Sequence, residues 1–284
     1  MSDAVLALDV GGTHLRGAIV AGGRVVDRAD AATAAGLRDG LERIVARLLP
    51  GSAAGAAGIG VPEYVRDGVV TSAEVVDWRP GTTDWAGRLV ARAAGRAVPV
   101  VVEADVRCGA VAEHARLADP AATSLLYVSW GTGVSSTLVL PGGLAWAGAR
   151  GEALAIGEWR DDAGRRLEDV AAGRGVERAY AAATGDPVDG VELHRRATGG
   201  DAVAAGLVEA ADRALGRAIG RLVDALDPHL VVVGGGIGAG RADRLTAHAA
   251  LGRRPGAPPL LAAHHGPDAG LIGAALVAAR ATAR

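Results

Sequence analysis

A pattern of short apolar segments joined by glycine turns occurs twice in this chain of 284 residues, and it limits the folds that the chain can adopt. In the first copy, apolar segments at 5–10, 13–20 and 24–27 are separated by glycine pairs. The second copy, with segments at 125–130, 134–140 and 144–148, has its turns 120 residues later. Such runs predict antiparallel meanders. Unless two unrelated hairpins match by chance, the repeat predicts two domains of related topology.

The rest of the chain alternates between helical and extended patterns. Apolar residues recur at helical spacing over 37–49, and the stretches at 106–115, 201–227 and 269–279 are also predicted helices. Short apolar runs at 58–61, 98–102, 230–236 and 260–264 predict strands. The chain is therefore predicted to be an α/β protein.

Composition excludes several classes of protein. Half of the residues are hydrophobic, so a core can form, and the formal net charge of -2 gives no sign of a nucleic-acid partner. The single cysteine, Cys108, excludes an internal disulfide and a zinc site with several cysteines. No apolar run is long enough to cross a membrane, and the N-terminal run has no basic residues before it. We expect a soluble cytoplasmic protein.

The first glycine turn has the residues of a phosphate site. Gly11 and Gly12 allow backbone N–H groups to approach an anion, Thr13 adds a hydroxyl donor, and Arg16 can reach the same anion from the next segment. Asp9 could hold Mg²⁺ through water. The alternative is an ordinary hairpin turn with an incidental aspartate.

Two further turns support the phosphate interpretation. Gly131, Thr132 and Gly133 form a second such turn, and Gly234, Gly235 and Gly236 follow a buried strand, as in a nucleotide-binding loop. Neither a G-x-G-x-x-G fingerprint after the first strand nor a G-x-x-x-x-G-K-[ST] loop is present. A phosphate site built from hairpin turns remains.

Six segments, in this order along the chain, resemble the motifs of the ROK family of sugar kinases and sugar-responsive repressors. They are LALDVGGTHLRGAIV, GIGVPEYVRDGVV, VEADVRCGAVAEH, SWGTGVSSTLVLPGGLAWAG, DPHLVVVGGGI and PDAGLIGAA. The resemblance implies a ribonuclease-H-like, actin-like ATPase fold of two domains with a nucleotide cleft between them. We place the domains at 1–104 plus 269–284 and at 105–268. The resemblance also implies that ATP and Mg²⁺ are the cofactors, that the adenosine lies beside Gly234–Gly236 and that the protein is a homodimer.

The same resemblance implies that Asp105 is the general base, because it matches the aspartate of the family's E-N-D segment. Phosphoryl transfer to a hydroxyl requires a proton acceptor near the attacking oxygen, and Asp105 stands between an apolar strand and a helix. The alternative is a helix N-cap.

The sugar-binding motifs are where the chain departs from the family. Ala104 replaces the asparagine before the catalytic aspartate, Glu63 the glycine of GVPG, and Glu74 an asparagine. In the G-E-x-G-H segment the histidine becomes Glu158, whereas Glu168 matches the next sugar-contacting glutamate. The family's cysteine-rich zinc segment is missing, so no structural zinc is expected. Either these glutamates arose by drift at solvated positions, or they line an acidic pocket that binds an amine-bearing substrate or a metal ion.

The resulting hypothesis is a kinase that transfers the γ-phosphoryl group of ATP to a hydroxyl of a small sugar, amino sugar or cyclitol. Neither nucleic acid nor a membrane is expected as a partner. The alternative is a catalytically inactive ROK-like ligand-binding or regulatory protein.

Overall fold

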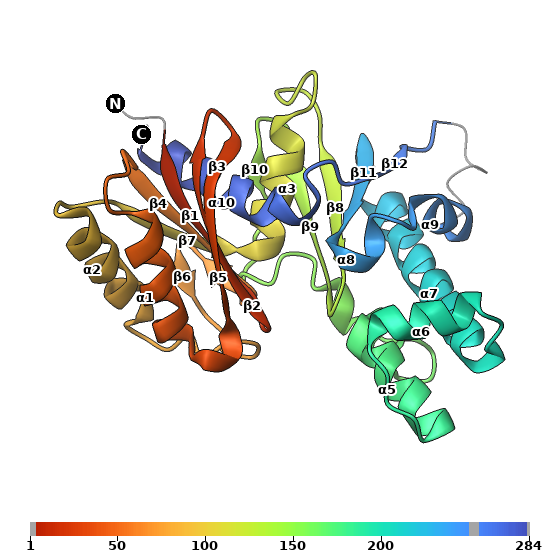
Figure 1. The fold of residues 1–284 in the computed structure, drawn as a ribbon. Coiled ribbons are helices and arrows are strands. Elements are labelled where there is room, and N and C mark those ends of the chain that lie inside the picture. Colours follow the sequence, from red (N-terminus) through yellow and green to blue (C-terminus); the bar gives the residue numbers. More distant parts are fainter. Residues whose placement is uncertain (1–3, 250–255, 283–284) are drawn as a thin grey trace. The chain divides into compact units, whose positions relative to one another are not determined.

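The computed structural model describes residues 4–249 and 256–282, which form two compact units of mixed α/β structure (Figure 1). Unit 1 comprises the chain up to residue 121, residues 139–153 and the chain from residue 267; unit 2 comprises residues 122–138 and 154–266. The predicted domain boundary between residues 104 and 105 stays a prediction; the helix that begins at Asp105 belongs to unit 1. Residues 1–3 and 283–284 of the predicted first domain lie outside the described residues.

Unit 1 is built on a five-stranded sheet in the order β3-β2-β1-β4-β7. The first three strands are antiparallel neighbours, and β1, β4 and β7 run parallel. The strands are β1 (Val5–Val10), β2 (His14–Ala21), β3 (Arg24–Ala32), β4 (Ala56–Val61) and β7 (Val100–Ala104). A separate hairpin joins β5 (Val65–Arg66) and β6 (Val69–Val70).

Helices cover both faces of this sheet. They are α1 (Leu37–Leu48), α2 (Thr82–Ala94), α3 (Asp105–Ala115) and α10 (Ala269–Thr282). Side chains alternate along β1, so Leu8 lies on the face that α1 covers, near Gly17, whereas Ala7 packs in the core cluster of α10.

The C-terminal helix α10 lies unusually close to its neighbours because two contact points are glycines. Gly58 of β4 faces the main chain of Ala274, and Gly273 of α10 faces the main chain of Cys108 in α3. A Cβ atom at either glycine would overlap with these backbone atoms. Helix α10 is therefore an integral part of the core of unit 1.

The second sheet has the order β10-β9-β8-β11-β12. Its strands are β8 (Leu125–Trp130), β9 (Val134–Leu140), β10 (Leu144–Ala145), β11 (Leu230–Gly234) and β12 (Leu260–Ala262). The helices of unit 2 are α4 (Leu167–Ala171), α5 (Gly173–Thr184), α6 (Gly190–Thr198), α7 (Ala202–Leu226), α8 (Gly235–Gly238) and α9 (Ala242–His248). Single 3-10 turns occur at Thr33–Ala35, Ile156–Glu158 and Gly266–Asp268.

Helix α7 is the long apolar helix predicted from the sequence. Asp201 caps its first turn by accepting hydrogen bonds from the N–H groups of Val203 and Ala204. The helix ends at Asp227, which has a left-handed backbone and precedes Pro228. None of the described helices is long and apolar enough to span a membrane.

The predicted repeat is confirmed in the topology. Both sheets have the same strand order, in which the first strand of the meander lies between the second strand and a parallel partner. Strands β8, β9 and β10 each begin 120 residues after β1, β2 and β3.

Candidate active site

Three parallel strands of unit 1 end side by side, and each of these ends carries a carboxylate. Asp9 lies near the end of β1, Glu63 follows β4, and Asp105 follows β7 directly. A Cβ built on Gly60 of β4 would lie 3.8 Å from Oδ1 of Asp9 and 3.6 Å from the Cα atom of Asp105. The carboxyl ends of parallel strands are the usual binding edge of such sheets. The structure therefore brings Asp9 and Asp105 together on either side of Gly60.

Asp105 is partly buried, and its surroundings raise its pKa to about 7. Burial is the largest cause, and the neighbouring Asp9 and Glu63 carboxylates raise the pKa further. A hydrogen bond of 2.6 Å from the N–H of Val106 opposes the shift, as does Arg107. The N-cap residue of α3 is Ala104 and not Asp105, and no side chain makes a capping hydrogen bond there. The interpretation of Asp105 as a helix N-cap therefore gains no support. A carboxylate that titrates near neutral pH can accept and release a proton.

Asp9 lies in a recess between β1 and the first turn of α10. Burial raises its pKa, and Arg16, 4.0 Å away, lowers it. A Cβ at Gly270, the second residue of α10, would lie 3.0 Å from the Asp9 carboxylate, so glycine leaves room for that group. Arg16 also donates to the carbonyl of Pro267 at 3.2 Å, which holds its guanidinium at this edge.

The donors available at this edge fit a hydrated Mg²⁺ ion better than a fully protein-bound metal. Among residues 4–249 and 256–282 there is no group of three or more His, Cys, Asp or Glu side chains able to hold a metal ion. Mg²⁺ keeps most of its water and takes one or two carboxylates, and Asp9 can supply one of them.

The predicted phosphate turn of unit 1 is an exposed tip held at both ends. The N–H of Gly11 donates to the carbonyl of His14 at 2.9 Å, and the Thr33 hydroxyl donates to the carbonyl of Gly11 at 2.8 Å. Gly12 and Thr13 are exposed between these contacts. The turn thus presents its central residues to solvent.

In unit 2 the turn at Gly131–Gly133 rests on the beginning of α5. The N–H of Gly173 donates to the carbonyl of Gly131 at 2.9 Å, and Thr132 at the tip is exposed. The N atom of Gly236 lies 3.5 Å from the place where a Cβ of Gly131 would be. The structure therefore brings the Gly131–Gly133 and Gly234–Gly236 turns together, as expected for one nucleotide site.

The third turn requires glycine. Gly235 has φ +82°, and a Cβ there would overlap with the carbonyl of Trp130. At Gly234 a Cβ would overlap with the hydroxyl of Tyr127. Gly236 has no such neighbour.

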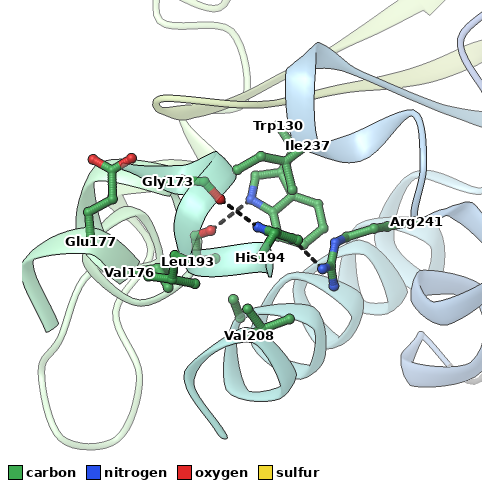
Figure 2. Close-up of a pocket in the computed structure, with 12 residues that line it drawn as sticks. Trp130, Gly173, Val176, Glu177, Leu193, His194, Val208, Ile237 and Arg241 are labelled. Atoms are coloured by element: carbon green, nitrogen blue, oxygen red, sulfur yellow. Dashed lines mark hydrogen bonds between the residues drawn. The ribbon is translucent and has the colours of Figure 1, made fainter. Parts of the chain in front are cut away.

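A small apolar pocket lies beside this turn, and the sequence did not predict it (Figure 2). Trp130, Ile237 and Leu193 line it, and the indole N–H of Trp130 donates to the carbonyl of Ala171 at 2.7 Å. Arg241 borders the pocket and contacts His194 Nε2 and the buried Asp212. The position of Ile237 directly after the glycines could have indicated an apolar wall of this pocket. Nothing in the sequence indicated that α5 and α6 would contribute the other walls.

Glu63, a predicted substrate residue, lies inside unit 1 with its carboxylate fully occupied. Its two oxygens accept hydrogen bonds from the Ser72 hydroxyl at 2.5 Å and from the backbone N–H groups of Glu74, Val75 and Val76 at 2.6–2.9 Å. Only 4% of Glu63 is exposed. It fixes the loop that carries Glu74, whose own side chain is exposed.

Arg107 is a second organising residue of this edge, and the sequence analysis missed it. Its buried guanidinium donates to Glu103 at 2.7 Å, to the carbonyl of Gly151 at 3.0 Å and to the carbonyl of Val65. Glu103 also accepts the N–H of Ala104 at 2.8 Å. The spacing of four residues between Glu103 and Arg107 was the available signal.

Two of the predicted substrate residues, Glu158 and Glu168, belong to unit 2. Glu158 is exposed and forms an ion pair with Arg166 at 2.9 Å. Glu168 accepts the N–H of Val134 at 3.2 Å and lies against the Cβ positions of Gly133 and Gly157. Glu168 therefore lies beside the second phosphate turn, whereas Glu158 is neutralised by a neighbour.

Comparisons with known proteins point to one family. The sequence model of the ROK family matches residues 5–281. An N-acetylmannosamine kinase of Escherichia coli O139:H28 is 31% identical over 96% of this chain and 97% of the relative. A ROK hexokinase from Thermus thermophilus is 33% identical with a TM-score of 0.75, and the match covers 99% of each chain. A ROK glucokinase from Streptomyces griseus, solved with glucose and AMPPNP, is 27% identical, with a TM-score of 0.79 over 98% of this chain and 99% of that one.

Proposed function

The chain belongs to the ROK family, and we propose that it is a carbohydrate kinase that transfers the γ-phosphoryl group of ATP to a hydroxyl of a sugar, amino sugar or cyclitol. The observation that carries this proposal is Asp105, at the end of β7 beside Asp9, with its pKa raised to about 7. The relatives support the substrate class, since one is named N-acetylmannosamine kinase and another is a glucokinase solved with glucose.

In the proposed reaction, Asp105 accepts the proton of the attacked hydroxyl as the substrate oxygen bonds to the γ-phosphorus. The bond from that phosphorus to the bridging oxygen breaks, and ADP leaves with the electron pair. Little covalent chemistry falls to the protein, so alignment and charge neutralisation dominate. Mg²⁺, when bound, would neutralise phosphate charge, and Asp9 would hold it through water.

The glycine turns would bind the nucleotide. In unit 1, exposed Gly12 and Thr13 with Arg16 would contact phosphate oxygens. In unit 2, Thr132 and the adjacent Gly236 would do the same, and the apolar pocket lined by Trp130 and Ile237 would accept the base. A planar base suits a pocket with aromatic and aliphatic walls.

The contacts of the glutamates divide the predicted substrate residues into two groups. Glu63 and Glu158 have partners within their own units, so neither needs a cation. Glu168, with one oxygen on the Val134 N–H, and the exposed Glu74 are the better candidates for contacting hydroxyls or an amine. Ala104 offers no polar group, and the site must hold its substrate without the amide of the family's asparagine.

A substrate panel tests the proposal directly. ADP release would be measured with glucose, mannose, N-acetylmannosamine, glucosamine and myo-inositol, each with ATP and Mg²⁺. We expect at least one sugar to give turnover that disappears in Asp105→Asn. Tight ATP binding without ADP release from any polyol would contradict the kinase proposal and favour an inactive relative.

A further inference from the structure

Unit 2 has a second cavity, which shares no lining residue with the phosphate turns or the predicted substrate residues. It is a groove with a cavity volume of about 300 Å³ between the segment 159–170 and helix α7. Five arginines line it: Arg160, Arg165, Arg213, Arg217 and Arg221. We refer to it as the arginine groove.

One wall is a small hairpin that stands where the family's zinc segment would follow. Arg160 and Arg166 are bridged as antiparallel partners, and Asp161 Oδ1 accepts the N–H groups of Ala163 and Arg165 at 3.0 and 2.9 Å. Asp161 Oδ2 accepts the side chain of Arg165 at 2.8 Å. The hydrogen bond from the Arg165 N–H is the largest cause that lowers the pKa of Asp161. This wall is therefore held by its own contacts, and the charge of Asp161 is balanced by Arg165.

The other wall is a row of arginines on α7. Arg213, Arg217 and Arg221 are four residues apart, so they project from one side of the helix over a length of about 12 Å. Like charges at this spacing repel one another. Alanines at 210, 214 and 218 also line the groove, and their small side chains leave space beside the row.

The charges of the groove do not balance. Arg165 is paired with Asp161, and Arg213 with Glu209 at 3.3 Å. Over residues 4–249 and 256–282, neither Arg217 nor Arg221 forms an ion pair or a side-chain hydrogen bond, and Arg160 donates to the carbonyl of Gly164. The further acidic lining residue is Asp162. The groove thus carries an excess of positive charge that a bound anion would relieve.

We propose that the arginine groove binds a small ligand that carries two or more phosphate groups. Guanidinium groups bind phosphate through paired hydrogen bonds, and successive arginines of the row lie about 6 Å apart along the helix axis. The volume of the groove, about 300 Å³, lies at the lower end of the range of small-molecule sites. This site is additional to the proposed ATP site, and the two sites involve different residues.

Binding of inorganic triphosphate, measured by calorimetry, tests the proposal. The titration is repeated in Thr132→Val, which removes a hydroxyl donor of the proposed ATP site. In Arg217→Ala/Arg221→Ala we expect the affinity for triphosphate to fall about tenfold or more, since two charged hydrogen-bonding groups are lost. The matched control is Arg88→Ala/Arg92→Ala, which removes two exposed arginines four residues apart on α2; its affinity should equal that of the parent.

Two further arms separate the alternatives. Arg217→Lys/Arg221→Lys keeps the charge and should retain part of the affinity, which an effect of misfolding would not do. A hexose bisphosphate that competes with triphosphate would identify a phosphorylated sugar as the source, whereas failure to compete would favour inorganic oligophosphate. Equal triphosphate affinity in the groove variant and the control would overturn the proposal. So would loss of triphosphate binding in Thr132→Val but not in the groove variant, or binding of a polyglutamate peptide to a protein that does not bind triphosphate.

Discussion

The two sheets have the same strand order but differ in the chemistry at the ends of their strands. In unit 1 the first turn follows Asp9 and precedes Arg16; the equivalent positions 120 residues later are Ser129 and Ser136. Asp105 and Glu63 complete an acidic edge in unit 1. The second sheet presents glycine turns and a pocket walled by Trp130 and Ile237. The same scaffold thus carries a glycine turn in each copy, and the side chains at the strand ends place carboxylates in the first copy alone of the two compared edges.

The two turns also differ in what holds them. The turn of unit 1 is tied by one side chain, Thr33, and its Gly12 and Thr13 are exposed. The turn of unit 2 rests on the start of α5 and lies against Gly236. The two turns are thus held by different partners: Thr33 in unit 1, through its hydroxyl and its N–H group, and the start of a helix in unit 2.

Removing the proton acceptor of unit 1 should have the most severe consequence. In Asp105→Asn, kcat should fall about 100- to 10,000-fold, because an amide cannot take the hydroxyl proton, while nucleotide affinity stays near that of the parent. Steady-state kinetics with the best sugar and calorimetry with ADP measure both. Asp84→Asn, at an exposed position on α2, is the control and should be as active as the parent.

The same variant tests the environment of Asp105 through pH. Its folded-state pKa of about 7 exceeds the ordinary value of 3.8, so the folded form holds its proton more tightly than the unfolded form. Stability of the parent relative to Asp105→Asn should therefore fall as pH rises from about 4 to about 7 and then level off. Activity should show the opposite trend and be lost below about pH 7. A stability difference that does not change with pH would mean that Asp105 is not desolvated.

Substitution of the strained turn in unit 2 should cost stability. In Gly235→Ala the positive φ and the overlap with Trp130 should lower the free energy of unfolding by about 2–4 kcal/mol. Gly236→Ala, with no neighbour within 4 Å, should lower it by well under 1 kcal/mol, as is usual at open positions. Chemical denaturation of the two variants gives the comparison. Equal losses would contradict the close packing of this turn.

The buried glutamate of unit 1 should matter more as a loop anchor than as a ligand. In Glu63→Gln an amide NH₂ would face backbone N–H donors, and we expect a loss of about 1–3 kcal/mol of stability together with a raised KM. Glu74→Gln, which alters an exposed neighbour on the same loop, should leave stability unchanged. A raised KM with full stability in Glu63→Gln would instead indicate direct contact with substrate.

The glutamate-to-glutamine change in unit 2, at Glu158, should have the weakest effect of these substitutions. Glu158 is exposed and paired with Arg166, so Glu158→Gln should change stability by less than about 1 kcal/mol. Turnover of amino sugars and neutral sugars should remain in the parent ratio. A selective loss of amino-sugar turnover in this variant would restore the acidic-pocket hypothesis.

The sequence predicted the fold largely because the repeat and the glycine turns are local patterns. The meanders, α7 and the place of Asp105 after a strand all follow from spacing along the chain. What the sequence could not reveal depends on contacts between distant residues. The four donors on Glu63, the reach of Arg107 to Gly151 and the walls contributed by α5 and α6 require the fold itself. Glu63 is the clearest case. From the sequence, a glutamate that replaces a glycine suggested an acidic pocket residue, whereas its hydrogen-bond partners are visible only in the fold.

The close packing of α10 has a consequence for biosynthesis. This helix covers β1 and β4 and touches α3, yet it follows every other element of unit 1 along the chain. Until α10 has been translated, one face of the sheet of unit 1 is not covered by this helix, and the apolar residues around Ala7 and Ala18 are exposed to solvent. Residues 154–266 of unit 2, by contrast, are all synthesised before α10. Nascent chains are prone to aggregate through such uncovered surfaces, so we expect unit 1 to complete its folding only after α10 has been synthesised.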